Sequence, residues 1–237
     1  MNNQDTIFRE LKQRVYEANM RLHTSGVVKL TFGNVSEKWQ FEDSYLVAIK
    51  PSGVAYKQMR PDDIVIVLPD GKPLPGALRP SSDTATHLVI YAELPHWSGV
   101  AHTHSVFATA WAQSGISIPI LGTTHADYSP CDVPCTSAMS EVDIETQYER
   151  NTGLHLIRHL QTENSINSSM VLVHGHGAFT FGKNAEESVD TSIVLEEIAQ
   201  MAYYTLRINQ NALPISQKLI DKHYLRKHGA EKYYGQN

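Results

Sequence analysis

Apolar residues recur along much of this chain at helical spacing, and shorter apolar stretches between them are typical of strands. The first helix is indicated by apolar positions that run from Ile7 to Leu22 with a period near 3.6. The stretch 184–210 carries the same period over the longest distance in the chain. Helices are expected at 6–24, from Ser82 to the breaker at Pro95, in the second half of 97–113, at 145–161, at 184–210 and in the tail from Leu219.

Five apolar stretches bounded by turn residues predict strands. Two contain clear turn signals, a Pro-Ser-Gly turn after residue 50 and an Asp-Gly pair at residues 70–71. A third is interrupted by glycines within 169–182. The expected strands lie in 26–36, 44–54, 62–74, the first half of 97–113 and 169–182. With no repeat or linker in the chain, this mixture predicts one α/β domain over residues 1–237.

The composition is that of an ordinary globular protein and argues against several classes. Of the 237 residues, 41% are hydrophobic and 19% charged, and the net charge of −5 argues against a groove for nucleic acid. The polar start lacks the apolar core of a signal peptide, and no apolar run is long enough for a bilayer. Cys131 and Cys135 are too few for a disulfide framework, so we expect reduced thiols in a cytoplasmic protein.

Two histidine pairs carry the candidate chemistry. His102 and His104 are two residues apart in one short apolar stretch, and His174 and His176 repeat the spacing in another. In a strand, residues i and i+2 point to the same face. Such pairs are compatible with hydrogen-bonded core histidines and with ligands of a divalent cation. Asp83, at a predicted helix start, could add a carboxylate, and the residues alone leave both interpretations open.

A series of motifs in a fixed order covers nearly the whole chain and resembles the class II aldolase/epimerase family. The tail motif is similar to that of the epimerase branch of the family. The motifs are TFGNVS (31–36), IKPSGV (49–54), PSSDT (80–84), HTHS (102–105), GTTHADY (122–128), VLVHGHGAF (171–179), FGKNAEESV (181–189) and DKHYLRKHGAEKYYGQ (221–236).

The resemblance implies a fold, an assembly and a metal site. The fold is a single three-layer α/β/α domain around a largely antiparallel central sheet. The assembly is a homotetramer with active sites at subunit interfaces, where the tail 221–237 completes a neighbouring subunit's site. The implied ligands of a divalent metal ion, with zinc expected, are His102, His104 and His176, joined by Asp83. Related aldolases have a glutamate in place of Asp83, and the shorter acid favours the epimerase branch while leaving direct metal contact open. His174 is then a packed strand residue.

The implied activity is that of an isomerase acting on a small sugar phosphate. It interconverts L-ribulose 5-phosphate and D-xylulose 5-phosphate by cleaving the C3–C4 bond, rotating glycolaldehyde phosphate and re-forming the bond. The implied acid/base pair is Asp127 and Tyr234, on opposite faces of the reacting oxygen, with Tyr234 donated by a neighbouring subunit. A class II sugar-phosphate aldolase is the alternative, and a non-catalytic binding module a more distant one. L-arabinose catabolism and L-ascorbate degradation both use this step, and the sequence does not choose between them.

Three small polar turns are the implied cradle for the substrate phosphate. Backbone N–H groups at turns and helix starts attract oxyanions, although the same turns would otherwise be read as ordinary ones. The implied residues are Gly33, Asn34, Ser52, Gly53, Ser81 and Ser82. Lys50, Thr123, Glu149 and His223 lie in similar segments with roles that the resemblance leaves open.

Overall fold

A six-stranded sheet, antiparallel at every junction, forms the centre of the computed structural model, which describes residues 3–163, 165–229 and 232–233. The order of strands across the sheet is β3-β2-β1-β4-β6-β5, so β4 lies near the middle and β5 at an edge. The strands are β1 (Asn34–Phe41), β2 (Ser44–Ile49), β3 (Val65–Val67), β4 (Gly99–Thr103), β5 (Met170–Val173) and β6 (Gly177–Gly182).

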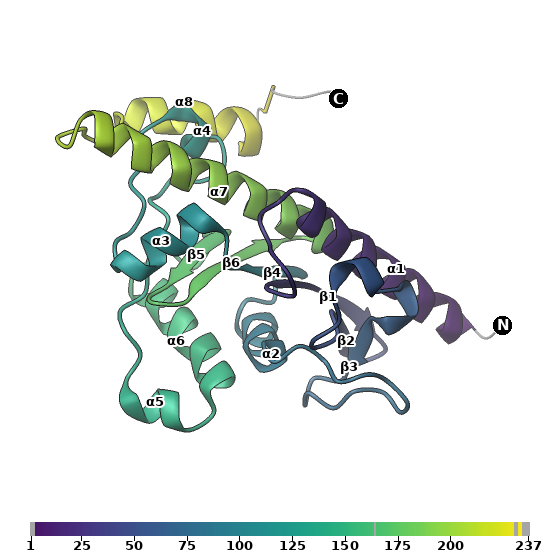
Figure 1. Cartoon of the computed structure of the whole chain (residues 1–237). Helices are drawn as coiled ribbons and strands as arrows, with labels where there is room; N and C mark the ends of the chain where they lie inside the picture. Colours follow the sequence, from purple (N-terminus) through teal and green to yellow (C-terminus); the bar gives the residue numbers. More distant parts are fainter. Residues whose placement is uncertain (1–2, 164, 230–231, 234–237) are drawn as a thin grey trace.

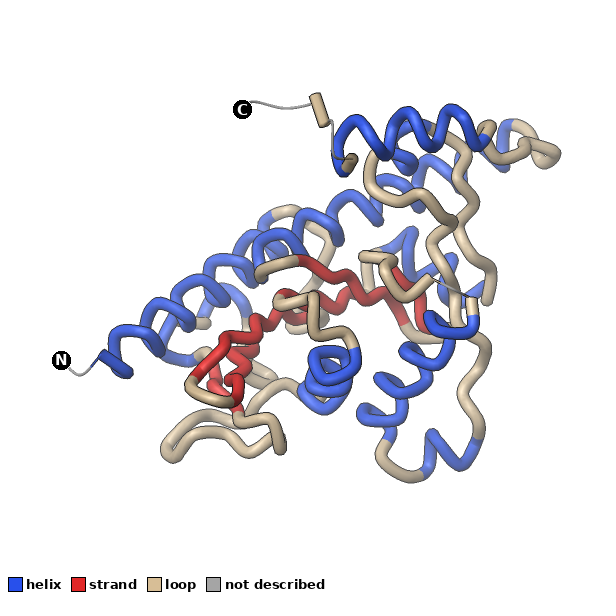
Figure 2. The backbone as a smooth tube through the Cα atoms, turned by 180° about the vertical axis from the view of Figure 1, so that it is seen from behind, coloured by secondary structure: helices blue, strands red, loops and turns tan. Residues whose placement is uncertain are grey.

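Helices cover both faces of this sheet, which confirms the expected three-layer α/β/α architecture (Figures 1 and 2). The helices α1 (Asn3–Thr24), α3 (Val106–Ser114) and α7 (Ala185–Ile208) pack on one face, and α2 (Thr84–Glu93) and α6 (Tyr148–Thr162) on the other. The remaining elements are α4 (Thr123–Ala126), α5 (Glu141–Glu145), α8 (Gln217–His228) and the 3-10 turns Tyr56–Gln58 and Pro61–Asp63.

Alternating side chains in the strands supply both cores. In β2, Val47 and Ile49 pack towards α2 and α6, whereas Leu46 and Ala48 pack towards α1. All four side chains are almost completely buried. A strand covered on both faces therefore appears in the sequence as a continuous apolar run, as residues 45–49 do.

The strand expected over 26–36 begins later than predicted, at Asn34. Val27 and Val28 are buried as the apolar pattern suggests, but they pack from an irregular segment rather than a paired strand. Leu30 and Gly33 have positive φ angles of 52° and 77°, which a regular strand does not allow. Gly33 is also required for space, because a Cβ there would lie 2.7 Å from the carbonyl oxygen of His102.

The glycine break expected within 169–182 is a chain reversal. β5 and β6 pair antiparallel, with Val173 opposite Gly177, and the turn between them places Gly175 at a φ of 69°. Gly177 packs against β4 so closely that a Cβ would lie 2.6 Å from the carbonyl oxygen of Thr103. This hairpin brings the second histidine pair to the end of β4.

The short helix α4, which the apolar pattern did not predict, is held by α8. Ile120 and Ala126 pack with Ile215 and Ile220 in a small apolar cluster separate from the main cores. Four residues cannot form a stable helix alone, so α4 depends on this packing. In Figure 1 the two helices lie together beside the end of α7.

Two expectations about thiols and membranes can be compared with this structure. Cys131 is exposed and Cys135 is buried, and both are free thiols. Across the ranges that the structure describes, no helix has the length and apolarity that crossing a bilayer requires.

Candidate active site

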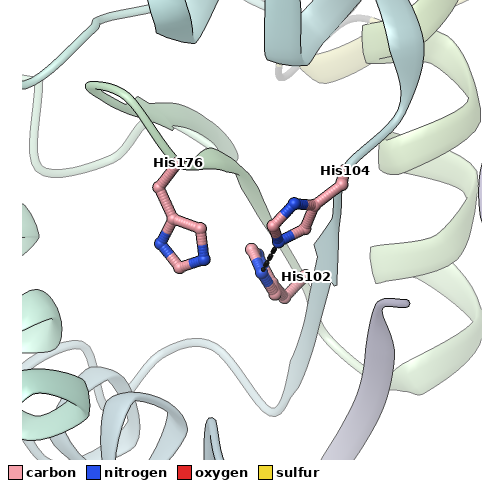
Figure 3. A group of neighbouring side chains, drawn as sticks. All are labelled: His102, His104 and His176. Atoms are coloured by element: carbon pink, nitrogen blue, oxygen red, sulfur yellow. Dashed lines mark hydrogen bonds between the residues drawn. The ribbon is translucent and has the colours of Figure 1, made fainter. Parts of the chain in front are cut away.

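Three imidazole rings converge where β4 ends and the β5–β6 hairpin turns (Figure 3). His102 is in β4, His104 follows the strand, and His176 is in the hairpin turn. One nitrogen from each ring lies within 4.8 Å of the other two. The three ring centroids are 4.8–5.0 Å apart. Within the described part of the chain, this is the one set of three or more potential ligands that meets in this way.

The protonation of these rings suits a divalent cation. Nδ1 of His102 lies 2.9 Å from the carbonyl oxygen of Ala178, and because a carbonyl only accepts, the ring's proton is on Nδ1. Its Nε2 lone pair therefore faces Nε2 of His104, 3.0 Å away. Burial, with the neighbouring His102 and His104, lowers the pKa of His176 to about 3, and its Nδ1 is buried without a partner. Three imidazoles whose nitrogens converge are a ligand set of the kind that can hold a catalytic divalent cation.

Asp83 lies beside this histidine group but is not a member of it. Its carboxylate accepts a hydrogen bond of 2.6 Å from Nδ2 of Asn34. Burial opposes its ionisation, yet His102, His87 and the Asn34 bond outweigh burial and keep the pKa of Asp83 below its usual value. The carboxylate is therefore ionised and anchored next to the rings, and direct metal contact by Asp83 stays a prediction.

His174 is not part of the histidine group, in line with its expected role as a packed residue. Its backbone N–H donates to Oγ1 of Thr136. Its ring lies over Gly115, where an added Cβ would come within 3.2 Å of Nε2. Only one histidine of the second pair therefore points towards the first pair.

The histidine group forms one wall of a cavity of about 480 Å³. The rest of the lining comes from the turns after β2 and before α2, from the segment before β1 and from the start of α6. All the residues expected to bind phosphate line this cavity, as do two of the residues whose roles were left open: Gly33, Asn34, Ser52, Gly53, Ser81, Ser82, Lys50 and Glu149. Asp83 lines it as well.

The two serine turns are fixed to each other by backbone hydrogen bonds. The N–H of Ser52 donates to the carbonyl of Arg79 at 2.9 Å, and the N–H of Ser81 donates to the carbonyl of Lys50 at 3.0 Å. These two N–H groups are therefore used within the protein, which leaves the serine hydroxyls as donors. The two linked turns form one polar wall of the cavity that the histidines also line.

Lys50 provides positive charge beneath this wall. Its side chain is buried, and Nζ donates to the carbonyl of Val54 at 2.9 Å and lies 4.9 Å from the centre of the Tyr56 ring. Burial lowers the pKa of the Lys50 amine. The hydroxyl of Tyr56 in turn donates to the carbonyl of Gly33, so one ring supports both the lysine and the glycine turn. A bound anion in the cavity would favour the charged amine.

Asp127 lies elsewhere in the chain, on the α4–α8 pair. It ends α4, and its carboxylate accepts hydrogen bonds from His223 and Arg226 of α8. Asp127, His223 and Thr123 are not among the described residues that line the histidine cavity. Tyr234 lies outside the described residues. Among the described residues, one chain thus brings together the metal and phosphate candidates, whereas Asp127 lies away from their cavity.

Two aromatic residues of the cavity were not singled out from the sequence. The Tyr148 ring lies 6.2 Å from that of His176, and Phe32, more than half exposed, lies 6.3 Å from His104. Tyr148 directly precedes Glu149, and Phe32 lies within the motif at 31–36. Both positions adjoin predicted site residues, and this proximity in sequence was the signal from which they could have been predicted.

A buried polar chain lies behind the site, and it predicts how stability depends on pH. Nδ1 of His87 lies 2.7 Å from Oγ of Ser36, which lies 2.7 Å from the Tyr91 hydroxyl. Burial lowers the pKa of His87 to about 3, against about 6.5 in the unfolded chain. Between these two pKa values His87 is protonated in the unfolded chain and neutral in the folded chain. The contribution of neutral His87 to the free energy of unfolding is therefore full above about pH 6.5 and is lost as pH falls towards 3.

We therefore expect the urea concentration at the unfolding midpoint to be lower at pH 5 than at pH 7. This decrease, measured with chelator present, should be larger for the wild type than for His87→Gln. The chelator removes any contribution from metal release. The other titrating groups are shared by the two proteins, so the difference between their slopes isolates His87. Equal losses in both proteins would contradict the prediction.

Comparison with known proteins agrees with this geometry. Residues 13–203 match the family model described as the class II aldolase and adducin N-terminal domain. The chain belongs to this class II aldolase family. It is 49% identical over 227 residues to a protein named L-ribulose-5-phosphate 4-epimerase UlaF from Salmonella paratyphi A, an alignment that covers 96% of this chain and 99% of that one. The corresponding protein of Salmonella typhi matches equally well.

Solved structures of the class II aldolase family share the fold. An L-fuculose 1-phosphate aldolase superposes with a TM-score of 0.74 at 20% identity, covering 90% of this chain and 94% of that chain. The L-fuculose 1-phosphate aldolase from Glaciozyma antarctica gives a TM-score of 0.76 at 15% identity, covering 98% and 86%. These likenesses confirm the class II aldolase fold expected from the sequence.

Proposed function

We propose that this protein is a divalent-metal-dependent isomerase that interconverts L-ribulose 5-phosphate and D-xylulose 5-phosphate. The observation that carries the proposal is the convergence of three imidazoles in a cavity that serine and glycine turns also line. Such a cavity suits a short polyhydroxy substrate that ends in a phosphate. The substrate itself is indicated by the printed name of the relatives at 49% identity.

The metal would be held by His102, His104 and His176, with the Asp83 carboxylate beside them. We expect zinc, because neutral imidazole ligands suit it. A bound divalent cation supplies Lewis-acid stabilisation of the negative charge that develops on the ketone fragment when C3–C4 breaks. The bond between Nδ1 of His102 and Ala178 fixes which nitrogen of that ring is presented.

Proton transfer is assigned to Asp127 and Tyr234. The C4 hydroxyl loses its proton to one of them as C3–C4 breaks and the electron pair flows into the C2 carbonyl. Glycolaldehyde phosphate then rotates, and the C3–C4 bond forms on its other face. The oxygen takes a proton from the second residue, so C4 is inverted and no proton is gained or lost overall.

A second copy of the chain completes the site in this proposal. Asp127 is on the α4–α8 pair and not at the cavity of its own chain, so it must reach the cavity of a neighbour. Apolar side chains near the end of α7 are exposed in the single chain, including Met201, Tyr204 and Ile208. A patch of this kind is typical of a subunit interface. We propose a homotetramer with active sites between subunits, located in the cytoplasm.

The phosphate would lie against the serine turns. Hydroxyls of Ser52 and Ser82 and the Asn34 amide line the cavity there, and Lys50 is close beneath. Phosphate placed at this wall would let the rotating fragment stay bound while its aldehyde turns. This retention distinguishes an epimerase from an aldolase.

The test is an assay of the purified protein with L-ribulose 5-phosphate, with and without chelator. We expect D-xylulose 5-phosphate to form, activity to stop with chelator, and added divalent metal to restore it. The rival activity is that of a class II sugar-phosphate aldolase. It is the natural comparison because two of the solved structures with the same fold are named as aldolases. Free aldehyde that accumulates faster than D-xylulose 5-phosphate would overturn the epimerase assignment.

Removing the hydroxyl of Tyr234 is expected to slow epimerisation at least about tenfold, because the reacting oxygen loses one of its two proton-transfer groups. The variant Tyr234→Phe should keep its metal content and its oligomeric state. Turnover, metal analysis and light scattering measure the three quantities. Tyr233→Phe, the neighbouring substitution, is the control, and turnover of Tyr234→Phe equal to that of the wild type would remove Tyr234 from the mechanism.

A further inference from the structure

The Asp127 carboxylate is held by an unusual concentration of basic groups from one helix. Nδ1 of His223 lies 2.9 Å from Oδ1 of Asp127. Arg226 donates twice, from Nε to Oδ1 at 3.1 Å and from Nη2 to Oδ2 at 2.8 Å. Nζ of Lys227 lies 3.6 Å from Oδ2, and the His228 ring lies 2.9 Å from the Asp127 carbonyl oxygen. α8 therefore contacts both the side chain and the backbone carbonyl of Asp127.

The spacing of these groups explains how one helix can do this. Residues 223, 226 and 227 are three and four apart, which places them on one face of α8. Arg226 is the group that fixes orientation, because a guanidinium forms two parallel hydrogen bonds with a carboxylate and holds its plane. A lysine ammonium acts as a point charge and leaves the plane of the carboxylate undetermined.

We propose that Arg226 is a positioning residue that sets the orientation of the Asp127 carboxylate for proton transfer. The inference rests on the proposed function, in which Asp127 exchanges a proton with the substrate. Arg226 acts through Asp127. Its guanidinium keeps the carboxylate in one plane while α4, too short to be rigid alone, is held by α8.

The charges around Asp127 agree with this role. Burial opposes ionisation of the carboxylate, but hydrogen bonds from Arg226 and His223 and the charge of Lys227 hold the pKa of Asp127 below its usual value. The groups that face it come from α8, whereas His125 of α4 interacts with Asp132 instead. Without Arg226, burial would weigh more heavily and the pKa of Asp127 would rise.

The experiment compares Arg226→Gln, Arg226→Lys and Lys227→Gln with the wild type on L-ribulose 5-phosphate. For Arg226→Gln we expect kcat to fall at least about tenfold with KM within threefold, and the acid limb of kcat to move to higher pH. Arg226→Lys should keep the acid limb near that of the wild type and still lose several-fold in kcat, because the charge remains and the paired hydrogen bonds do not. Lys227→Gln is the comparison variant, since it removes one charge near the same carboxylate and leaves both Arg226 hydrogen bonds in place, so its kcat should fall by less than that of Arg226→Gln.

Several results would overturn the inference. One is a folded Arg226→Gln with kcat within threefold of the wild type, and another is a variant in which only KM changes. Reduced thermal stability with an unmoved acid limb would indicate a purely structural role. If Arg226→Gln does not fold, the inference is tested with Arg226→Lys alone. A kcat of Arg226→Lys equal to that of the wild type would contradict the positioning role of Arg226.

Failure of the proposed function can be distinguished from failure of the Arg226 inference. A wild type that does not convert L-ribulose 5-phosphate refutes the function and leaves the Arg226 contact testable by carbon-13 titration of the Asp127 carboxyl, with Asp127→Asn to assign its signal. A pKa that stays unchanged in Arg226→Gln would then overturn the inference.

Discussion

His104→Ala is expected to lose bound divalent metal and epimerase activity together, with turnover falling at least about 100-fold. The ring supplies one of three nitrogens that lie within 4.8 Å of one another, and two ligands from the protein cannot hold a catalytic cation tightly. His104 is the exposed member of the group and follows the strand, so its loss should leave the sheet intact. Metal analysis after gentle purification and a coupled assay of D-xylulose 5-phosphate measure the two effects.

The matched control is His174→Ala, which removes an imidazole from the same neighbourhood but outside the group. Its metal content should equal that of the wild type. Excess zinc added back to His104→Ala should restore little activity. Full metal content in purified His104→Ala would count against its role as a ligand.

Asp127→Asn is expected to lower kcat by roughly 10²–10⁴, the range that general acid/base groups contribute, while metal content stays unchanged. Asparagine has the same shape but neither the charge nor a proton to exchange. KM should change little, because the substitution leaves the residues expected to hold the phosphate and the metal untouched. Steady-state kinetics, metal analysis and thermal unfolding distinguish this result from loss of folding.

Asp221→Asn is the control for Asp127→Asn, since it makes the same change at an exposed position of α8. It should retain the kcat of the wild type. Near-normal turnover by Asp127→Asn would leave proton transfer without its proposed carboxylate and would require another group.

The histidine group could be predicted because its signal is local. A His-x-His pair at the end of a short apolar stretch is visible within five residues, and the family motifs gave the partner at His176. The small turns that line the cavity were visible for the same reason. The strand expected over 26–36 was placed too early because burial of Val27 and Val28 mimics a strand, while the φ angles of Leu30 and Gly33 exclude one.

The surroundings of Asp127 could not be read in the same way. Its contacts with His223 and Arg226 join segments about a hundred residues apart, and no local pattern indicates which helix covers α4. Nor does sequence periodicity show that this pair lies away from the cavity of its own chain. These features depend on tertiary packing, which a pattern within one segment does not encode.

The location of His176 in the β5–β6 hairpin has a consequence for biosynthesis. His102 and His104 leave the ribosome long before β6, and until β6 pairs with β4 the nascent chain offers only two of the three rings. Tight capture of the ion must then wait for late synthesis and sheet closure, so the metal cannot template early folding. A chain that stalls before the hairpin would compete poorly for a scarce divalent ion.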